Sequence, residues 1–359
     1  MLTDNAYLYG KPQSSGLLRS KMSDFKVFEK LPFEPCGEGE HLLVHIKKTG
    51  TNTLFVARQL AKYFNVKEQL VSYAGLKDRF AVTEQWFGVH LPGKEVFDLS
   101  DLVIEGVDIL SYQRHNKKLR TGALIGNHFE IILREVTAIK ALTERWHNIV
   151  TGGIPNYFGE QRFGIDGGNI EKAIALFSGH KVKDKKKRGI YLSAARSSIF
   201  NQVINERILG QCFNHITTGD VLMLAGTQSI FLVDEITAEL EQRLREKDVD
   251  ITAPMWGAGE PMTSLDPLAL EQKVADNNSV LSSGLPRFGL KQERRRIRLS
   301  VADTDIELLN AETDNHSVKV KFFLPAGCYA TTVLRELLVY QDMTTRIDKR
   351  ALTDDDNRV

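Results

Sequence analysis

Polar and apolar residues alternate in several short stretches of the chain, and this is the spacing of β-strands. The clearest alternation covers residues 127–134, and one face of it holds Asn127, Phe129, Ile131 and Leu133. Because successive side chains of a strand point to opposite faces, these four share one side of a sheet. Further strands are predicted at residues 42–46, 86–91, 102–110, 306–309 and 318–324.

Other stretches carry apolar residues three and four positions apart, which predicts helices. One begins after a turn at residues 49–51 and includes Val56, Leu60 and Phe64. The other helices are predicted at residues 169–177, 194–209, 236–246 and 330–340. Strands and helices mixed in this way predict an α/β (α+β) fold.

The length of 359 residues exceeds what one hydrophobic core usually serves, so we expect two domains. The run of helix and strand breakers at residues 151–155 marks one boundary. A second boundary is expected near residues 298–303, where a basic segment gives way to a strand. The end of the chain after Asp342 is polar and reads as a tail.

The bulk composition is that of a soluble globular protein, with 42% hydrophobic and 26% charged residues. No run approaches the roughly 18 apolar residues of a membrane span, and no signal peptide opens the chain. A cytoplasmic protein is the simplest expectation. The three cysteines lie far apart and the nine histidines are scattered, so the spacing predicts no metal site.

Positive charge is concentrated locally although the net charge is only +1. Residues 181–188 hold six basic residues, residues 291–298 hold five and residues 114–120 hold four. A charge run is usually a solvated face. Three such runs balanced by acidic residues elsewhere also suit a surface that meets RNA phosphates.

The stretch Ala74-Gly75-Leu76-Lys77-Asp78-Arg79 carries the most suggestive chemistry. Lys77 and Arg79 are expected to hold Asp78 ionised or, because successive side chains often diverge, to face RNA instead. Gly75 lets another backbone or a substrate come close. An ionised, reachable carboxylate can act as a nucleophile. A lone Asp in a loop also serves as a turn former or a cap, so this spacing alone leaves both readings open.

Further motifs follow in a fixed order along the chain. They are Asn127-His128-Phe129, Pro155-Asn156-Tyr157-Phe158-Gly159 with Gln161-Arg162-Phe163-Gly164, Ser193-Ala194-Ala195-Arg196-Ser197, and Leu324-Pro325-Ala326-Gly327-Cys328-Tyr329-Ala330. Together with the Asp78 loop, they make the chain resemble the TruD family of tRNA pseudouridine synthases. The resemblance runs from residue 8 to residue 338, which is nearly the whole chain.

The resemblance implies a fold of two domains. A catalytic pseudouridine synthase domain with a central, mostly antiparallel mixed sheet would comprise residues 1–152 and 301–340. A second α/β domain, the TRUD domain, would be inserted at residues 153–300, and residues 341–359 would form the polar tail. In the family, RNA binds in a cleft between the two domains.

The resemblance also implies an activity, the isomerisation of uridine to pseudouridine, by analogy at uridine 13 of the tRNA D-arm. The rearrangement consumes nothing and needs no cofactor. Asp78 would be the catalytic carboxylate. It could attack C1′, act as a base at C2′ or attack C6 of the base, and the sequence does not separate these routes. The partner would be tRNA, and the protein is expected to be a monomer with no obligate protein partner.

Five further site residues are carried over from the family pattern. Arg19, in Gly16-Leu17-Leu18-Arg19, would pair with the catalytic carboxylate. Phe129 would be an aromatic lid over the flipped uracil, with Asn127 on the same face offering its amide to the base. Phe25 would line the pocket. Tyr329 would pack on the nucleoside, and it departs from the family, which usually has Phe there.

Two other classes of function compete with this reading. One is a non-catalytic RNA-binding or chaperone protein of the same fold, which the intact Asp78 disfavours. The other is a hydrolase with an Asp nucleophile, for which Asp303-Thr304-Asp305 faintly resembles a phosphatase motif. No apolar parallel strand is predicted before that motif.

Overall fold

The computed structural model describes residues 5–93, 98–309 and 316–344, and the chain divides into two compact units. As far as these ranges are described, the first unit consists of Thr151–Ser300 with Met1–Lys11 and Thr331–Glu336. The second unit consists of Pro12–Val150 with Val301–Ala330 and Leu337–Val359. The catalytic and RNA-binding roles expected for such a division remain predictions.

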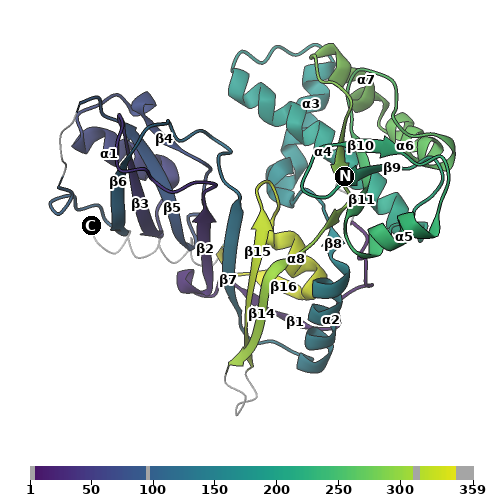
Figure 1. The fold of residues 1–359 in the computed structure, drawn as a ribbon, viewed down its shortest axis with the longest axis horizontal. Helices are drawn as coiled ribbons and strands as arrows, with labels where there is room; N and C mark the ends of the chain where they lie inside the picture. The colour runs from purple at the N-terminus through teal and green to yellow at the C-terminus, as the bar shows by residue number, and fades with distance from the viewer. Residues whose placement is uncertain (1–4, 94–97, 310–315, 345–359) are drawn as a thin grey trace. The chain divides into compact units, whose positions relative to one another are not determined.

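An eight-stranded sheet is the centre of the second unit (Figure 1). In spatial order its strands are β14 (Ala302–Leu309), β15 (Ser317–Pro325), β7 (Gly126–Leu133), β2 (Phe25–Lys30), β5 (Val82–His90), β3 (His41–Thr49) and β6 (Val107–His115), with β4 (Val71–Tyr73) paired to β5. Among the described strands of this sheet, β2 and β5 form the one parallel pair. The predicted mixed, mostly antiparallel sheet is therefore confirmed.

The strand β7 lies between β2 and β15, and its register fixes the neighbours of the predicted site residues. Phe129 is opposite Val27 of β2 on one side and Phe322 of β15 on the other. The alternation read from the sequence holds, since Phe129 and Ile131 are buried while Glu130 between them is partly exposed.

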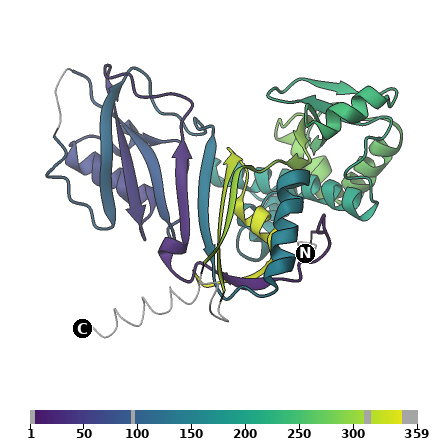
Figure 2. The ribbon, with the colours of Figure 1, turned by 60° about the horizontal axis from the view of Figure 1, so that its bottom comes forward.

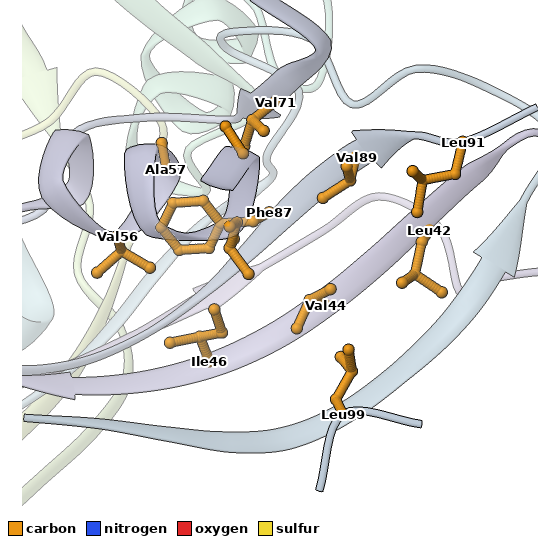
Figure 3. Packing of buried hydrophobic residues seen from close by; sticks show 12 residues of the cluster. Leu42, Val44, Ile46, Val56, Ala57, Val71, Phe87, Val89, Leu91 and Leu99 are labelled. Carbon is orange, nitrogen blue, oxygen red and sulfur yellow. The ribbon is translucent and has the colours of Figure 1, made fainter. Parts of the chain in front are cut away.

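The helix α1 (Thr53–Tyr63) covers one face of this sheet and completes a hydrophobic core. Figure 3 shows the fully buried ring of Phe87 between Val56 and Ala57 of the helix and Ile46 of β3. The first residue of α1, Thr53, contacts the loop that joins β4 to β5, since its hydroxyl accepts a hydrogen bond from the Lys77 N–H. A second helix, α2 (Ile139–Gly152), packs on the sheet through Trp146, whose ring centroid is 6.1 Å from that of Phe322 (Figure 2).

Several predicted elements have other boundaries in the structure. The helix expected at residues 330–340 ends earlier, because α8 covers Ala330–Leu337 and the chain then enters β16 (Val339–Asp342). This strand pairs in parallel with β1 (Ser15–Leu18), a partner so distant in sequence that local periodicity cannot reveal it. The strand expected at residues 102–110 begins only at Val107, because Gly106 turns the chain with a φ of +71°.

The described part of the first unit combines a four-stranded antiparallel sheet with five helices between residues 168 and 287, and it also includes most of α8. The sheet has the order β10 (Ile230–Leu232), β9 (Val221–Leu224), β11 (Val249–Met255) and β12 (Glu293–Arg296), while β8 (Ile154–Pro155) pairs with β13 (Arg298–Leu299). The helices are α3 (Gly168–Phe177), α4 (Lys185–Leu209), α5 (Ala238–Arg245), α6 (Leu265–Asn277) and α7 (Ser279–Arg287).

The helix α4 begins nine residues before its predicted start at residue 194. Asp184 caps it, since its carboxylate accepts hydrogen bonds from the backbone N–H groups of Lys186 and Lys187. The polar, basic first turns carry no apolar stripe, so periodicity missed them. Across the described ranges, no helix is both long and apolar enough to cross a membrane.

Replacing Phe87 with Ala should lower the free energy of unfolding by about 3–5 kcal/mol, because it empties a fully buried ring site. Urea denaturation measures this loss. Val103→Ala is the control, since Val103 is 90% exposed and its truncation should change stability by less than about 0.5 kcal/mol. Equal stabilities of the two variants would contradict this account of the core.

Candidate active site

The loop that carries Asp78 joins β4 to β5, and its backbone is held by side chains from below. The hydroxyl of Thr53 accepts a hydrogen bond from the backbone N–H of Lys77 at 3.1 Å and donates to the Gln85 amide oxygen at 2.9 Å. The Gln85 amide in turn donates to the carbonyl of Gly75 at 3.3 Å. Thr53 and Gln85 are buried, so the loop is fixed at two points to the core.

The carboxylate of Asp78 has a defined orientation and is still open to solvent. Its Oδ1 accepts a hydrogen bond from the backbone N–H of Phe80 at 3.1 Å. Its Oδ2 accepts one from the Arg19 guanidinium at 2.7 Å. The Asp78 side chain is 30% exposed, so a substrate can reach a carboxylate that two donors hold in place.

Arg19 links this carboxylate to a second one. Its guanidinium also donates to Asp342 of β16, at 2.5 Å, and lies 4.3 Å from the ring centroid of Phe25. The Arg19 side chain is 6% exposed, and its backbone has a left-handed φ of +57°. A non-glycine residue held in that region costs of order 1–3 kcal/mol, so the surrounding contacts must enforce the position.

Lys77 and Arg79 do not contact the Asp78 carboxylate, although the sequence analysis expected both to hold its charge. The ammonium of Lys77 lies 2.5 Å from a carboxylate oxygen of the buried Glu29, and Arg79 donates to the carbonyl of Gly50 at 3.3 Å. Neighbouring side chains on an extended loop diverge, and these two are directed away from Asp78. Arg19 is the cation on Asp78.

The aromatic residues of the predicted pocket are packed within the second unit. Phe25 is 4% exposed and Phe129 is 8% exposed, and their rings meet edge to face with centroids 6.2 Å apart. Phe129 also stacks on Phe322 at 5.3 Å. A continuous chain of contacts therefore runs from Asp78 through Arg19 and Phe25 to Phe129. Phe129 is a core residue whatever its role toward substrate.

Asn127 lies two residues before Phe129 on the same face of β7. Its side chain is partly exposed, yet its Oδ1 is buried and has no hydrogen-bond partner among the described residues. A buried acceptor without a hydrogen bond destabilises the fold, and a donor from a bound molecule would remove this cost. Tyr329 lies half-buried directly before α8, and the contacts above do not reach it.

Lys48 is a residue of this site that the sequence analysis missed. Its side chain is fully buried, and its ammonium donates to the backbone carbonyls of Asp78 and Thr51, each at 2.8 Å. Burial lowers the pKa of Lys48 from 10.5 to about 8, with Asp78 opposing the change and Lys77 adding to it. The available signal was its position, since Lys48 is two residues after Ile46 and therefore lies on the same buried face of β3.

No group of three or more His, Cys, Asp or Glu side chains in the described ranges is arranged to hold a metal ion. What the site offers is a charged, oriented carboxylate with an unsatisfied amide acceptor on the neighbouring part of the sheet. A carboxylate held in this way can act as a nucleophile or as a base toward a bound molecule.

Comparisons with known proteins place this geometry in context. The family model of tRNA pseudouridine synthase D (TruD) matches residues 2–174 and 171–337. The chain is 74% identical to the tRNA pseudouridine synthase D of Colwellia psychrerythraea over 355 residues, which are 98% of this chain and 97% of the relative. It is 45% identical to the protein of the same name from Aeromonas salmonicida, over 94% of this chain and 95% of that relative.

The fold is also similar to a solved structure. A crystal structure from Methanosarcina mazei, of a protein assigned as tRNA pseudouridine synthase D, matches with a TM-score of 0.69. The match covers 94% of this chain and 95% of the other, at 22% sequence identity. At that identity the likeness supports the α/β fold alone.

The buried Lys48 predicts a pH dependence of stability. Its folded pKa of about 8 is below the ordinary 10.5, so between these values the unfolded chain binds more protons and stability rises with pH. Relative to Lys48→Met, the wild type should gain about 2–3 kcal/mol in the free energy of unfolding from pH 7 to pH 10. Denaturation of both proteins across this range measures the difference.

Lys47→Met is the matched control, because the neighbouring Lys47 points to the other face of β3 and its side chain is 40% exposed. This variant should follow the wild type at every pH. If the stability curves of the wild type and Lys48→Met stay parallel between pH 7 and pH 10, the burial of a charged Lys48 is refuted.

Proposed function

This chain belongs to the TruD family of tRNA pseudouridine synthases, and on that premise we propose that it converts uridine 13 of the tRNA D-arm to pseudouridine with Asp78 as its catalytic carboxylate. A pseudouridine synthase is an isomerase. The observation that carries the assignment of Asp78 is its carboxylate, held by Arg19 at 2.7 Å and 30% exposed.

The reaction breaks the N1–C1′ bond of uridine, turns the freed uracil and joins it to the ribose through C5. Each candidate route needs an anionic oxygen at the reacting sugar or base. The Arg19 guanidinium stabilises that anion in Asp78, while the hydrogen bond from the Phe80 N–H fixes the other oxygen. Asp78 therefore presents a charged oxygen in one orientation.

Asn127, Phe25 and Phe129 suit the handling of a flipped base. The unpaired Oδ1 of Asn127 can accept a hydrogen bond from an N–H of uracil, which would satisfy both groups. Removing uridine from its stack costs a few kcal/mol, and ring surfaces offset part of that cost. Phe25 and Phe129, whose buried rings meet edge to face, are the aromatic residues proposed for this role.

Basic residues at the start of α4 are the best candidates for contact with RNA phosphates. Lys185, Lys186 and Lys187 are exposed and occupy the first turn of the helix. Cations are unfavourable there, because the N-terminus of a helix carries partial positive charge. These lysines lower the stability of the helix but concentrate positive charge on its surface. Such a concentration of charge favours binding of an anionic partner.

The competing phosphatase reading of Asp303-Thr304-Asp305 has no structural support. These residues belong to β14, a strand at the edge of the sheet that pairs antiparallel with β15. Asp303 lies 3.7 Å from His128, and Asp305 lies 3.4 Å from Lys321. Both carboxylates are consistent with ordinary surface pairs.

Replacing Asp78 with Asn should abolish turnover while leaving tRNA affinity nearly unchanged. The amide keeps the size of the side chain but loses the charge that the reaction requires, and such a loss costs at least about a hundredfold in rate. Release of tritium from C5-labelled uridine in tRNA measures turnover, and filter binding measures affinity.

Asp342→Asn is the matched control for that experiment, because it removes the other carboxylate on Arg19 and leaves Asp78 in place. This control should retain clearly more activity than Asp78→Asn. If Asp78→Asn kept more than about a hundredth of the wild-type rate, Asp78 would not be the catalytic carboxylate.

Replacing Lys185, Lys186, Lys187 and Arg188 together with Ala should weaken tRNA binding and flatten its salt dependence. Each lost phosphate contact lowers the slope of log affinity against log salt by about 0.7–0.9. In the control, Arg243 and Arg245 become Ala; these cations already pair with Asp248 and Glu241. An unchanged slope in the fourfold variant would make the run a solvated face.

A further inference from the structure

Lys48 is a charged residue buried on an apolar face of the sheet, where its charge is unfavourable for folding. Its side chain is among the largest that are fully buried, on the face of β3 that also carries Val44 and Ile46. Burying an ammonium in such a place is costly unless a carboxylate pairs with it. None of the ion pairs formed between described residues includes Lys48, and its two acceptors are backbone carbonyls.

Those two carbonyls belong to different segments of the site. One is that of Thr51, in the turn between β3 and α1, and the other is that of Asp78 itself. Thr53, at the start of the same helix, binds the backbone N–H of Lys77. Lys48 therefore links the turn to the loop. It binds the carbonyl of Asp78, and Thr53 binds the N–H of the preceding residue, Lys77.

The contacts around Asp78 divide between its side chain and its backbone. Arg19 and the N–H of Phe80 orient the two carboxylate oxygens. Lys48 holds the carbonyl oxygen of the same residue. If that carbonyl were released, the loop could rotate about Asp78 and displace the carboxylate, and a displacement of 1 Å in a catalytic group can cost about a hundredfold in rate.

We propose that Lys48 is a positioning residue for the isomerisation, whose buried ammonium fixes the backbone of Asp78 so that its carboxylate meets the ribose in the reactive orientation. The proposal rests on the proposed function. Lys48 does not touch the substrate in this account and acts only through Asp78. The lowered pKa of Lys48 agrees with it, because groups with strongly shifted pKa values are concentrated at functional sites.

The test compares Lys48→Met with Lys47→Met in single-turnover reactions on unmodified tRNA. Lys48→Met keeps the length and apolar stem of the side chain and removes the donors. Its rate of pseudouridine formation should fall about a hundredfold, with tRNA affinity within about twofold of the wild type. Lys47→Met should match the wild type in both measurements, since Lys47 contacts Asp108 on the other face of the strand.

Amide hydrogen exchange gives a readout that a loss of global stability would not produce. In folded Lys48→Met, residues 74–80 should exchange faster while residues 42–46 of the adjoining strand keep their protection. If Lys48→Met does not fold, Lys48→Gln replaces it, because its amide can donate to a carbonyl without charge. A rate for Lys48→Gln between those of the wild type and Asp78→Asn is then expected.

Two failures of this experiment are distinguishable. A wild type that forms no pseudouridine would refute the proposed function, and the role of Lys48 with it. A wild type that is active beside a folded Lys48→Met with the same rate, or with a loss in affinity alone, would refute the role of Lys48 only.

Discussion

The proposed activity depends on one requirement, which is to keep the Asp78 carboxylate charged, oriented and open to solvent on a loop. Arg19 meets the electrostatic part of it at 2.7 Å. The geometric part falls to buried groups beneath the loop, namely Thr53, Gln85 and Lys48. A flexible loop could expose a carboxylate equally well, but it would not present the carboxylate in one orientation, and catalysis gains most from groups that need no rearrangement.

The fold supplies this arrangement by joining segments that are far apart in the sequence. Arg19 follows β1, whose parallel partner β16 provides Asp342, the second carboxylate on Arg19. The strand β7 places Asn127 and Phe129 beside β2, which carries Phe25. The buried face fixes the register of this sheet, because a slip by one residue would move every side chain of a strand to the opposite face. The positions of these groups along the strands are therefore fixed.

The sequence predicts those elements that a local pattern of residues identifies. The alternation at residues 127–134 predicted β7 and the face of Phe129, and the loop motif singled out Asp78. Of the non-local partners that complete the site, Arg19 was implied by the family resemblance, and the others were not predicted. Lys77 was expected on Asp78 but pairs with Glu29, and Lys48 was overlooked although its phase on β3 is that of a buried residue. Asp342 was assigned to a polar tail because a strand that pairs with residues 15–18 leaves no periodic trace.

The central claim is that this chain isomerises one uridine of tRNA. Its most direct test is to incubate an unmodified tRNA transcript with the purified protein and to map pseudouridine chemically along the RNA by primer extension. The account predicts a single new stop, at the nucleotide immediately 3′ of uridine 13, in the presence of chelator and without any added cofactor. Pseudouridine at another position, or none in any tRNA tested, would contradict it.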